Sequence, residues 1–280
     1  RKALQNIKII HYVAPSVWAW RPERAAKMSK YVDHVLALLP FEPPYMEAEG
    51  MTSDFVGHPV VSSPHVSKKA QEKFKKKYNL HNGPIITVLP GSRIGEIKRM
   101  CPIFNKVLNN IEKLYPDSQF ILPVASSVEK DVVNAVKSWN VKPLLLLNEG
   151  KDLKELEHDK FITYSISSAA LATSGTVSLE LAAKKCPMIV AYKANWITTR
   201  MVKKLAKIDT ANLINIITDT KVIPEHLFEN CTVENITESL RSLLNNDNNQ
   251  IKAMEETMNR LGADRKDIHL LAANSVLNNI

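Results

Sequence analysis

Short apolar runs alternate with amphipathic segments along almost the whole chain of 280 residues. The segment 95–115 shows the helical pattern most clearly, because Ile97, Cys101, Phe104, Leu108 and Ile111 recur every three or four residues. Continuous apolar runs such as 144–147 are typical of strands that are buried on both faces of a parallel sheet. The pattern predicts strands at 7–13, 35–39, 54–56, 85–89, 119–124, 144–147, 169–173 and 188–192, and helices at 22–31, 42–49, 67–78, 95–115, 128–139 and 176–185, with three more helical segments after Val233.

Strands that alternate with helices indicate right-handed βαβ units, and therefore an α/β protein with parallel sheets. The string Gly57-His58-Pro59 interrupts this alternation, and Ser62-Ser63-Pro64 has the composition of a linker. We therefore expect two Rossmann-like, doubly wound domains: a partial one at 1–62, and a complete one with the closing helices at 63–280. The first has too few strands for a full sheet, so we expect the natural protein to continue upstream.

Composition narrows the class of protein further. A hydrophobic content of 45% and a charged content of 24% are ordinary for a globular protein, and no apolar run approaches the roughly 18 residues that span a bilayer. Cys101, Cys186 and Cys231 are far apart and have no histidine at ligand spacing, so we expect small core residues and no zinc site. The net charge of +8 indicates either an anionic partner or an ordinary lysine-rich surface, and no helix-turn-helix, zinc-finger or RNA-binding signature favours nucleic acid.

An anion site is predicted where the strand 85–89 runs through Gly91-Ser92-Arg93 into a helix. A small-residue turn before a helix presents free N–H groups at the positive end of the helix dipole. Arg93 adds donors suited to phosphate oxygens, and a bound anion would offset its unfavourable position in the first helical turn. Two alternatives use the same residues: Arg93 pairs with Glu96 on the surface, or Glu96 reaches back to Ser92 and caps the helix.

A second junction of the same kind has the string Ser174-Gly175-Thr176, followed one helical turn later by Glu180. The two hydroxyls can bind phosphate or cap the helix, and the carboxylate of Glu180 can accept both hydroxyls of a ribose or remain solvated. Both junctions lie at the carboxyl ends of strands in one sheet, where open α/β sheets bind ligands. Together they predict a phosphate-bearing ligand and favour a nucleotide.

Other segments carry polar side chains whose role the pattern leaves open. The segment 16–21 (Ser-Val-Trp-Ala-Trp-Arg) follows a strand and either lines a cleft or packs locally. The segment 196–207 is a basic amphipathic helix that either lies on anionic lipid or is an ordinary surface helix. The amides of Asn212 and Asn215 can read a base or a sugar, and His58 is either a general base or, more simply, a structural turn residue.

Together these motifs resemble the lipid-A-disaccharide synthase family, whose members are glycosyltransferases with the GT-B fold. The resemblance runs over nearly the whole chain, and the string at 16–21 is very specific, whereas Gly-Ser-Arg and Ser-Gly-Thr are shared more loosely with other GT-B enzymes. The matching strings are Pro15 with 16–21, Leu38-Leu39-Pro40-Phe41-Glu42, Phe55-Val56-Gly57-His58-Pro59, Leu89-Pro90-Gly91-Ser92-Arg93 with Glu96, Ser174-Gly175-Thr176 with Glu180, 187–193 (Pro-Met-Ile-Val-Ala-Tyr-Lys) and Leu213-Ile214-Asn215.

The resemblance implies two Rossmann-like domains of the GT-B type. It implies an inverting transfer of 2,3-diacylglucosamine from UDP to 2,3-diacylglucosamine 1-phosphate in lipid A biosynthesis, without a cofactor or a metal. It implies catalytic roles for Arg93 and Ser16, with the general base upstream of this chain. The residues implied to bind UDP are Gly91, Ser92, Arg93, Glu96, Ser174, Gly175, Thr176, Glu180, Tyr192, Lys193, Asn212 and Asn215. Those implied to line the acceptor cleft are Trp18, Trp20 and Arg21.

The resemblance also implies a homodimer, and a peripheral position on the cytoplasmic face of the Gram-negative inner membrane, whose anionic surface suits a basic protein. The family's N-terminal glycine-rich loop and proposed general base have no counterpart in this sequence. We therefore expect this chain to bind UDP and to turn over slowly or not at all. Two other functions remain open: a non-hydrolysing UDP-sugar 2-epimerase, which would require extra carboxylates at the cleft, and a non-catalytic nucleotide-binding module at a membrane surface.

Overall fold

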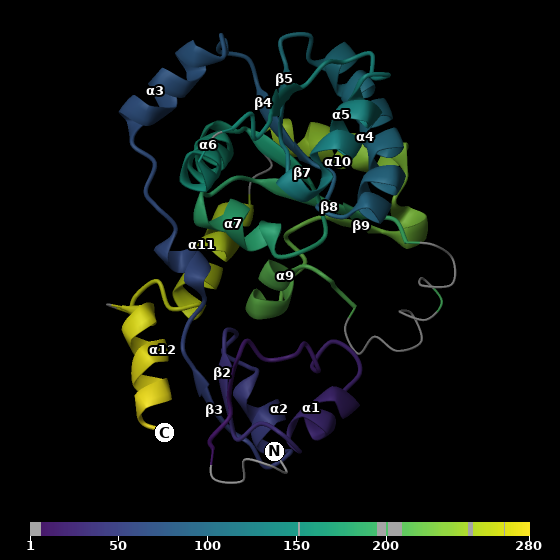
Figure 1. Cartoon of the computed structure of the whole chain (residues 1–280). Helices are drawn as coiled ribbons and strands as arrows, with labels where there is room; N and C mark the ends of the chain where they lie inside the picture. The colour runs from purple at the N-terminus through teal and green to yellow at the C-terminus, as the bar shows by residue number, and fades with distance from the viewer. Residues whose placement is uncertain (1–6, 151, 195–199, 201–208, 246–248, 266) are drawn as a thin grey trace. The chain divides into compact units, whose positions relative to one another are not determined.

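The computed structural model describes residues 7–150, 152–194, 200, 209–245, 249–265 and 267–280, which form two compact units (Figure 1). Unit 1 is built mainly from Arg1–Ser63 and Thr257–Ile280, and unit 2 mainly from Pro64–Trp196 and Thr210–Glu256. The chain leaves unit 1 after Ser63, one residue from the expected boundary. The residues from 257 to 280, which we expected in the second domain, group with unit 1 instead.

Unit 1 contains a small parallel sheet with the strand order β1-β2-β3. Its elements are β1 (Ile10–Tyr12), α1 (Glu23–Met28), β2 (His34–Ala37), α2 (Pro43–Glu47), β3 (Thr52–Phe55) and the C-terminal helix α12 (Ile268–Leu277). All four residues of β2 are buried. Val35 and Ala37 pack with residues of α1 and α2, whereas Leu36 packs with Val276 of α12. The apolar run at 35–39 therefore reflects a strand that is covered on both faces.

Polar contacts attach the end of the chain to this small sheet. His34 Nε2 lies 2.9 Å from Ser275 Oγ, and the Ser275 hydroxyl donates to Asp54 Oδ2 at 2.6 Å. The N–H of His58 donates to the carbonyl oxygen of Leu261 at 3.0 Å. These contacts explain why the last residues belong to unit 1. Periodicity could not predict this, because it identifies the buried face of a helix and not the surface against which that face packs.

Unit 2 is built on a six-stranded parallel sheet with the order β6-β5-β4-β7-β8-β9. Its strands are β4 (Ile85–Leu89), β5 (Gln119–Pro123), β6 (Leu144–Leu146), β7 (Ala169–Thr173), β8 (Met188–Tyr192) and β9 (Glu225–Leu227). The chain adds β5 and β6 on one side of β4 and then returns to place β7 on its other side. The strand order thus reverses between β4 and β7, and open parallel sheets bind ligands at the carboxyl ends of the strands at such a point.

Helices cover both faces of this sheet (Figure 1). On one face lie α4 (Ile94–Leu114), α5 (Glu129–Val136) and α10 (Val233–Leu244), and on the other lie α6 (Leu153–Ile166) and α7 (Val177–Ala183). Phe104, Leu108 and Ile111 of α4 are fully buried in the larger core, so the predicted apolar stripe is the face that packs on the sheet. The remaining described helices are α3 (Lys68–Lys77), α9 (Leu213–Thr218) and α11 (Gln250–Arg260), with short 3-10 turns at Pro59–Ser62, Ser126–Val128 and Phe228–Asn230.

The doubly wound α/β prediction is confirmed in unit 2, and β4, β7 and β8 have the predicted bounds. The three predicted helices after Val233 are α10, α11 and α12. The sequence did not predict α6, α9 or β9. In α6 the buried residues from Phe161 to Tyr164 are consecutive, so no stripe at helical spacing marks the helix. Apart from Arg200, which is exposed, the basic segment 196–207 lies outside the described residues.

Two further expectations concern the thiols and the membrane. Cys101, Cys186 and Cys231 are buried and form no disulfide, as expected. Burial raises the pKa of the Cys101 thiol to about 12, so this side chain remains a neutral core residue. Among the described helices, none has the length and apolar character needed to cross a bilayer.

Candidate functional site

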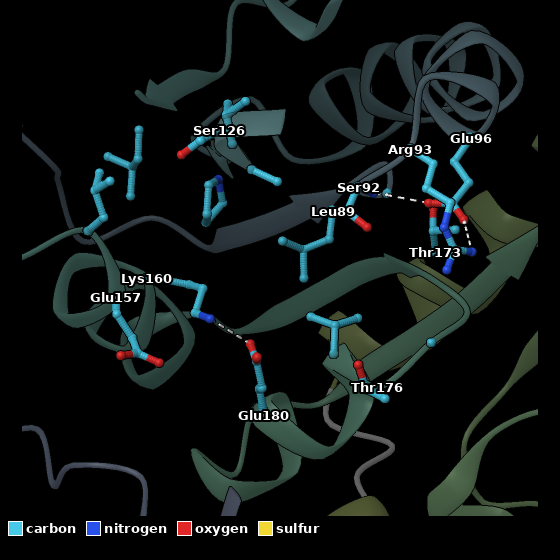
Figure 2. Close-up of a pocket in the computed structure, with 18 of the residues that line it drawn as sticks. Leu89, Ser92, Arg93, Glu96, Ser126, Glu157, Lys160, Thr173, Thr176 and Glu180 are labelled. Atoms are coloured by element: carbon cyan, nitrogen blue, oxygen red, sulfur yellow. Dashed lines mark hydrogen bonds and ion pairs between the residues drawn. The ribbon is translucent and has the colours of Figure 1, made fainter. Parts of the chain in front are cut away.

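A pocket of about 720 Å³ opens in unit 2 at the carboxyl ends of β4 and β7 (Figure 2). Residues of both strand-to-helix junctions line it, so the two turns singled out in the sequence face one shared cavity. The predicted site residues that the structure brings together here are Gly91, Ser92, Arg93, Glu96, Ser174, Gly175, Thr176 and Glu180. Their contact with a ligand stays a prediction.

The first junction is shaped by a contact between Gly91 and Glu96. The Glu96 side chain turns back so that Oε2 accepts a hydrogen bond from the Ser92 N–H at 3.0 Å. Gly91 has φ +115°, and a Cβ there would lie 2.5 Å from Glu96 Oε2 and 2.6 Å from Glu96 Cβ, so only glycine fits. The reach-back of Glu96 to Ser92 that the sequence suggested is confirmed.

Arg93 differs from its predicted place by one position. It is the N-cap residue of α4, with extended backbone (φ −123°, ψ 143°), and the helix begins at Ile94. Its side chain is 84% exposed, and Nη1 lies 3.4 Å from Glu96 Oε1, so the surface pair with Glu96 is also confirmed. Within the described residues the N–H groups of Ile94 and Gly95 donate to no carbonyl, as is usual at a helix start. The guanidinium and these N–H groups together form a cationic edge of the pocket.

The second junction presents backbone donors of its own. Thr176 is the N-cap of α7, but its hydroxyl makes no capping bond; Ser178 Oγ instead donates to the carbonyl oxygen of Gly175 at 2.9 Å. Of the two alternatives for the Thr176 hydroxyl, capping of the helix is therefore excluded, and phosphate binding stays a prediction. Within the described residues the N–H groups of Gly175, Thr176 and Val177 have no acceptor. This loop thus offers N–H groups and a hydroxyl that can bind an anion.

The third wall of the pocket comes from α6 and was missed in the sequence. Glu157, Lys160 and Tyr164 line it from positions that share one helical face, and Lys160 Nζ lies 3.0 Å from Glu180 Oε2 (Figure 2). Apolar residues complete the wall: Val124, Leu146, Leu153 and Leu156. In the sequence, only the spacing of three and four residues between Glu157, Lys160 and Tyr164 could have identified this face of the helix.

Tyr192 and Lys193, expected to bind UDP, do not line this pocket. The Tyr192 ring meets the ring of Phe228 edge-on, with centroids 6.5 Å apart. Lys193 is exposed, and its carbonyl oxygen accepts a hydrogen bond from Arg99 Nε at 2.9 Å. The loop after β8 is therefore tied to α4 through Arg99, a contact that the sequence did not predict.

Asn212 and Asn215, also expected at the nucleotide, are buried side chains outside the pocket lining. Asn212 is the N-cap of α9, where Oδ1 accepts from the Ile214 N–H at 2.9 Å. The Asn215 amide bonds both backbone groups of Ile223, donating to its carbonyl oxygen at 2.9 Å and accepting from its N–H at 3.0 Å. The Asn215 amide therefore braces the loop that leads into β9, and its contact with a ligand stays a prediction.

In unit 1 the tryptophan-rich segment is partly structural. Trp18 is 9% exposed, and its Nε1 donates to Glu42 Oε1 at 3.2 Å, which favours the local-packing alternative; its place on an acceptor cleft stays a prediction. Arg21 is exposed and stacks on Trp20, with Cζ 4.3 Å from the ring centroid. Ser16 lines a separate pocket of about 440 Å³ in unit 1. The catalytic role of Ser16 and the acceptor role of Trp20 and Arg21 stay predictions.

His58 has the structural role that the sequence favoured. Its Nδ1 accepts a hydrogen bond from the Val60 N–H at 3.1 Å and so begins the 3-10 turn Pro59–Ser62. Burial lowers the pKa of His58, because the charged imidazolium is poorly solvated there. In the described part of the chain, no group of three histidine, cysteine or acidic side chains could hold a metal ion.

Comparison with known proteins gives a family match over almost the full chain. The family model described as lipid-A-disaccharide synthetase matches residues 1–277. A lipid-A-disaccharide synthase of Ruegeria pomeroyi is 43% identical over 279 residues, which cover 100% of this chain and 70% of the relative. One of Rhodospirillum centenum is 39% identical over 282 residues, covering 99% of this chain and 68% of the relative.

Solved structures share the fold at low sequence identity. A UDP-GlcNAc 2-epimerase from Neisseria meningitidis, solved with UDP-GlcNAc bound, has a TM-score of 0.65 at 15% identity, covering 98% of this chain and 71% of its own. A glycosyltransferase from Rickettsia africae has a TM-score of 0.57 at 14% identity, covering 99% and 71%. These likenesses show the two-domain GT-B fold, and the family match shows the kind of enzyme. The chain therefore belongs to the lipid-A-disaccharide synthase family, and it is a GT-B glycosyltransferase of lipid A biosynthesis.

Proposed function

We propose that this enzyme transfers 2,3-diacylglucosamine from UDP to 2,3-diacylglucosamine 1-phosphate with inversion, forming a β-1,6-linked disaccharide and UDP. The observation that carries the proposal is the shared pocket at the switch point of unit 2. Two strand-to-helix junctions present backbone N–H groups to it, and Arg93 adds a guanidinium. This arrangement suits the diphosphate of a nucleotide sugar.

The diphosphate is also the leaving group, so the same donors serve catalysis. Negative charge grows on the oxygen between the phosphate and the sugar as the glycosidic bond breaks. N–H groups at the start of α4 are fixed in place before that charge develops, which is the most effective form of electrostatic stabilisation, and the Arg93 guanidinium lies beside them. These groups supply positive charge without a metal ion, in line with a metal-independent transfer.

The nucleoside part of the donor would occupy the α6 side of the pocket. Val124, Leu146, Leu153 and Leu156 offer an apolar surface to a base, and Glu180 offers a carboxylate to the ribose hydroxyls. The volume of about 720 Å³ lies within the range of about 300–1,000 Å³ that is usual for ligand pockets.

The acceptor and the membrane belong to the same proposal. Ser16, Trp20 and Arg21 of unit 1 would bind the acyl-sugar phosphate. Both substrates carry acyl chains, so the enzyme would act at the cytoplasmic face of the inner membrane, where a net charge of +8 favours the anionic surface. It would act there as a homodimer.

The test is a transfer assay with UDP-2,3-diacylglucosamine and 2,3-diacylglucosamine 1-phosphate. The chain would be assayed beside the full-length Ruegeria pomeroyi relative. We expect both proteins to bind UDP and to release UDP and disaccharide in equal amounts, the chain more slowly, because it spans 70% of the relative's length. Epimerisation of a UDP-sugar without transfer would support the 2-epimerase alternative, whose fold is shared at 15% identity. Nucleotide binding by the chain with neither reaction would support a non-catalytic module.

A further inference from the structure

Glu180 is held by two side chains of α6. Its Oε2 lies 3.0 Å from Lys160 Nζ, and the carboxylate also interacts with the hydroxyl of Tyr164. Lys160 and Tyr164 are four residues apart and therefore lie on the same face of the helix. Figure 2 shows Lys160 and Glu180 pointing toward one another across the pocket. Glu180 is thus an organised carboxylate, in contrast to the solvated side chain that its surface position suggested.

The phenol of Tyr164 is a fixed donor. Tyr164 is 1% exposed, and its ring packs edge-on against Phe161 with centroids 6.3 Å apart. Burial raises the pKa of its hydroxyl well above the usual value, and the negative charge of Glu180 adds to this effect. Tyr164 therefore remains protonated at neutral pH, and its hydroxyl can donate to the carboxylate.

The helix that carries both side chains is anchored to the sheet. Beyond its end, Ser167 Oγ lies 2.6 Å from Thr87 Oγ1 in the central strand β4. The same Ser167 hydroxyl makes a 2.8 Å contact with the carbonyl oxygen of Thr163 in α6. Lys160 is 27% exposed, and its ammonium lies 5.0 Å from the ring centroid of Phe161. Both partners of Glu180 are therefore fixed relative to the strands whose ends form the pocket.

We infer that Lys160 and Tyr164 are positioning residues that hold the Glu180 carboxylate ready for the ribose of the donor nucleotide. A carboxylate has about four lone-pair sites, and these two neighbours use two of them. The remaining two match the two hydroxyls of a ribose. The inference rests on the proposed function, because it assigns the ribose of UDP to this side of the pocket. Binding then requires no reordering of Glu180, which is how a preorganised group raises affinity.

The experiment compares UDP with 2′,3′-dideoxy-UDP, which lacks both ribose hydroxyls, by calorimetric titration of the chain. Lys160→Met removes the ammonium and keeps most of the stem, and Tyr164→Phe removes only the hydroxyl. We expect each to weaken UDP binding about two- to twelvefold, the range for ordering one flexible side chain, and to change dideoxy-UDP binding less than about twofold. Lys160→Arg should restore affinity for UDP. Lys154→Met, on the same helix but exposed and outside the pocket, is the matched control.

The outcomes separate this inference from the proposed function. If the wild-type chain binds neither nucleotide, the proposed function fails and the inference fails with it. If the wild type binds UDP but Lys160→Met lowers the affinity for both nucleotides equally, or for neither, only the positioning role is overturned. Urea unfolding of each variant identifies any loss of fold, and Lys160→Met decides the question even if Tyr164→Phe does not fold, because Lys160 is partly exposed.

Discussion

The contact between Gly91 and Glu96 makes a sharp prediction for Gly91→Ala. The new Cβ would lie 2.5 Å from Glu96 Oε2 and 2.6 Å from Glu96 Cβ. The Cβ of Glu96 cannot rotate away, so the loop must move and the bond from the Ser92 N–H to Oε2 breaks. A side chain at φ +115° costs about 1–3 kcal/mol, and a hydrogen bond to a charged group contributes about 1.5–3 kcal/mol. We expect Gly91→Ala to lower the free energy of unfolding by about 2.5–6 kcal/mol.

Gly150→Ala is the matched control, because Gly150 has φ +77° and no heavy atom within 4 Å of the added Cβ. Its free energy of unfolding should fall only by the cost of a side chain at positive φ, about 1–3 kcal/mol. The free energies of unfolding would be measured by urea denaturation and the affinity for UDP by calorimetry. Displacing the loop should also weaken UDP binding at least about tenfold in the Gly91 variant and leave it unchanged in the control. Equal unfolding free energies and equal affinities for the two variants would refute the idea that Gly91 and Glu96 shape the anion loop.

Three further changes test other parts of the account. Arg93→Ala should weaken UDP binding by about 1.5–3 kcal/mol in calorimetry, while the exposed control Lys98→Ala has no effect; unchanged affinity for Arg93→Ala would remove it from the site. Trp18→Phe leaves Glu42 without one of its buried donors and should lower the free energy of unfolding of unit 1 by about 1–2 kcal/mol, measured by urea denaturation. An unchanged urea midpoint would contradict a stabilising role for that hydrogen bond. Burial lowers the pKa of His58, so protonation favours the unfolded state, and the free energy of unfolding should fall as the pH drops below the unfolded pKa of 6.5. His58→Asn keeps an acceptor for the Val60 N–H, so its free energy of unfolding should fall less between about pH 7.5 and about pH 5.5. A loss as large as that of the wild type would exclude His58 as its source.

The first junction was predictable because all of its information is local. The strand, the glycine and the returning glutamate lie between residues 85 and 96, and an apolar run followed by a small-residue turn indicates the whole unit. The second junction was predictable for the same reason. Their meeting in one pocket followed from topology, since the carboxyl ends of adjacent parallel strands lie at the same edge of a sheet.

The rest of the site depends on contacts that the sequence does not mark. Lys160 meets Glu180 only because α6 and α7 cover the same face of the sheet, and the packing of α6 shows no stripe at helical spacing. Asn215 was placed at the ligand because its amide can read a base, but a nearby backbone segment at Ile223 satisfies both ends of that amide. Trp18 likewise donates a hydrogen bond to the buried carboxylate of Glu42, which is 24 residues away in the sequence. An amide or indole shows what a side chain can bind, and only the fold shows which partner is nearest.

The central claim is that two strand-to-helix junctions of unit 2 hold one diphosphate between them. The most direct measurement is the change in backbone amide chemical shifts when UDP is added to the isotope-labelled chain. The account predicts that the largest changes fall on two separate stretches at once, 94–95 and 175–177, because those N–H groups bind the phosphate oxygens. Changes confined to one stretch, or centred on residues outside this pocket, would contradict it.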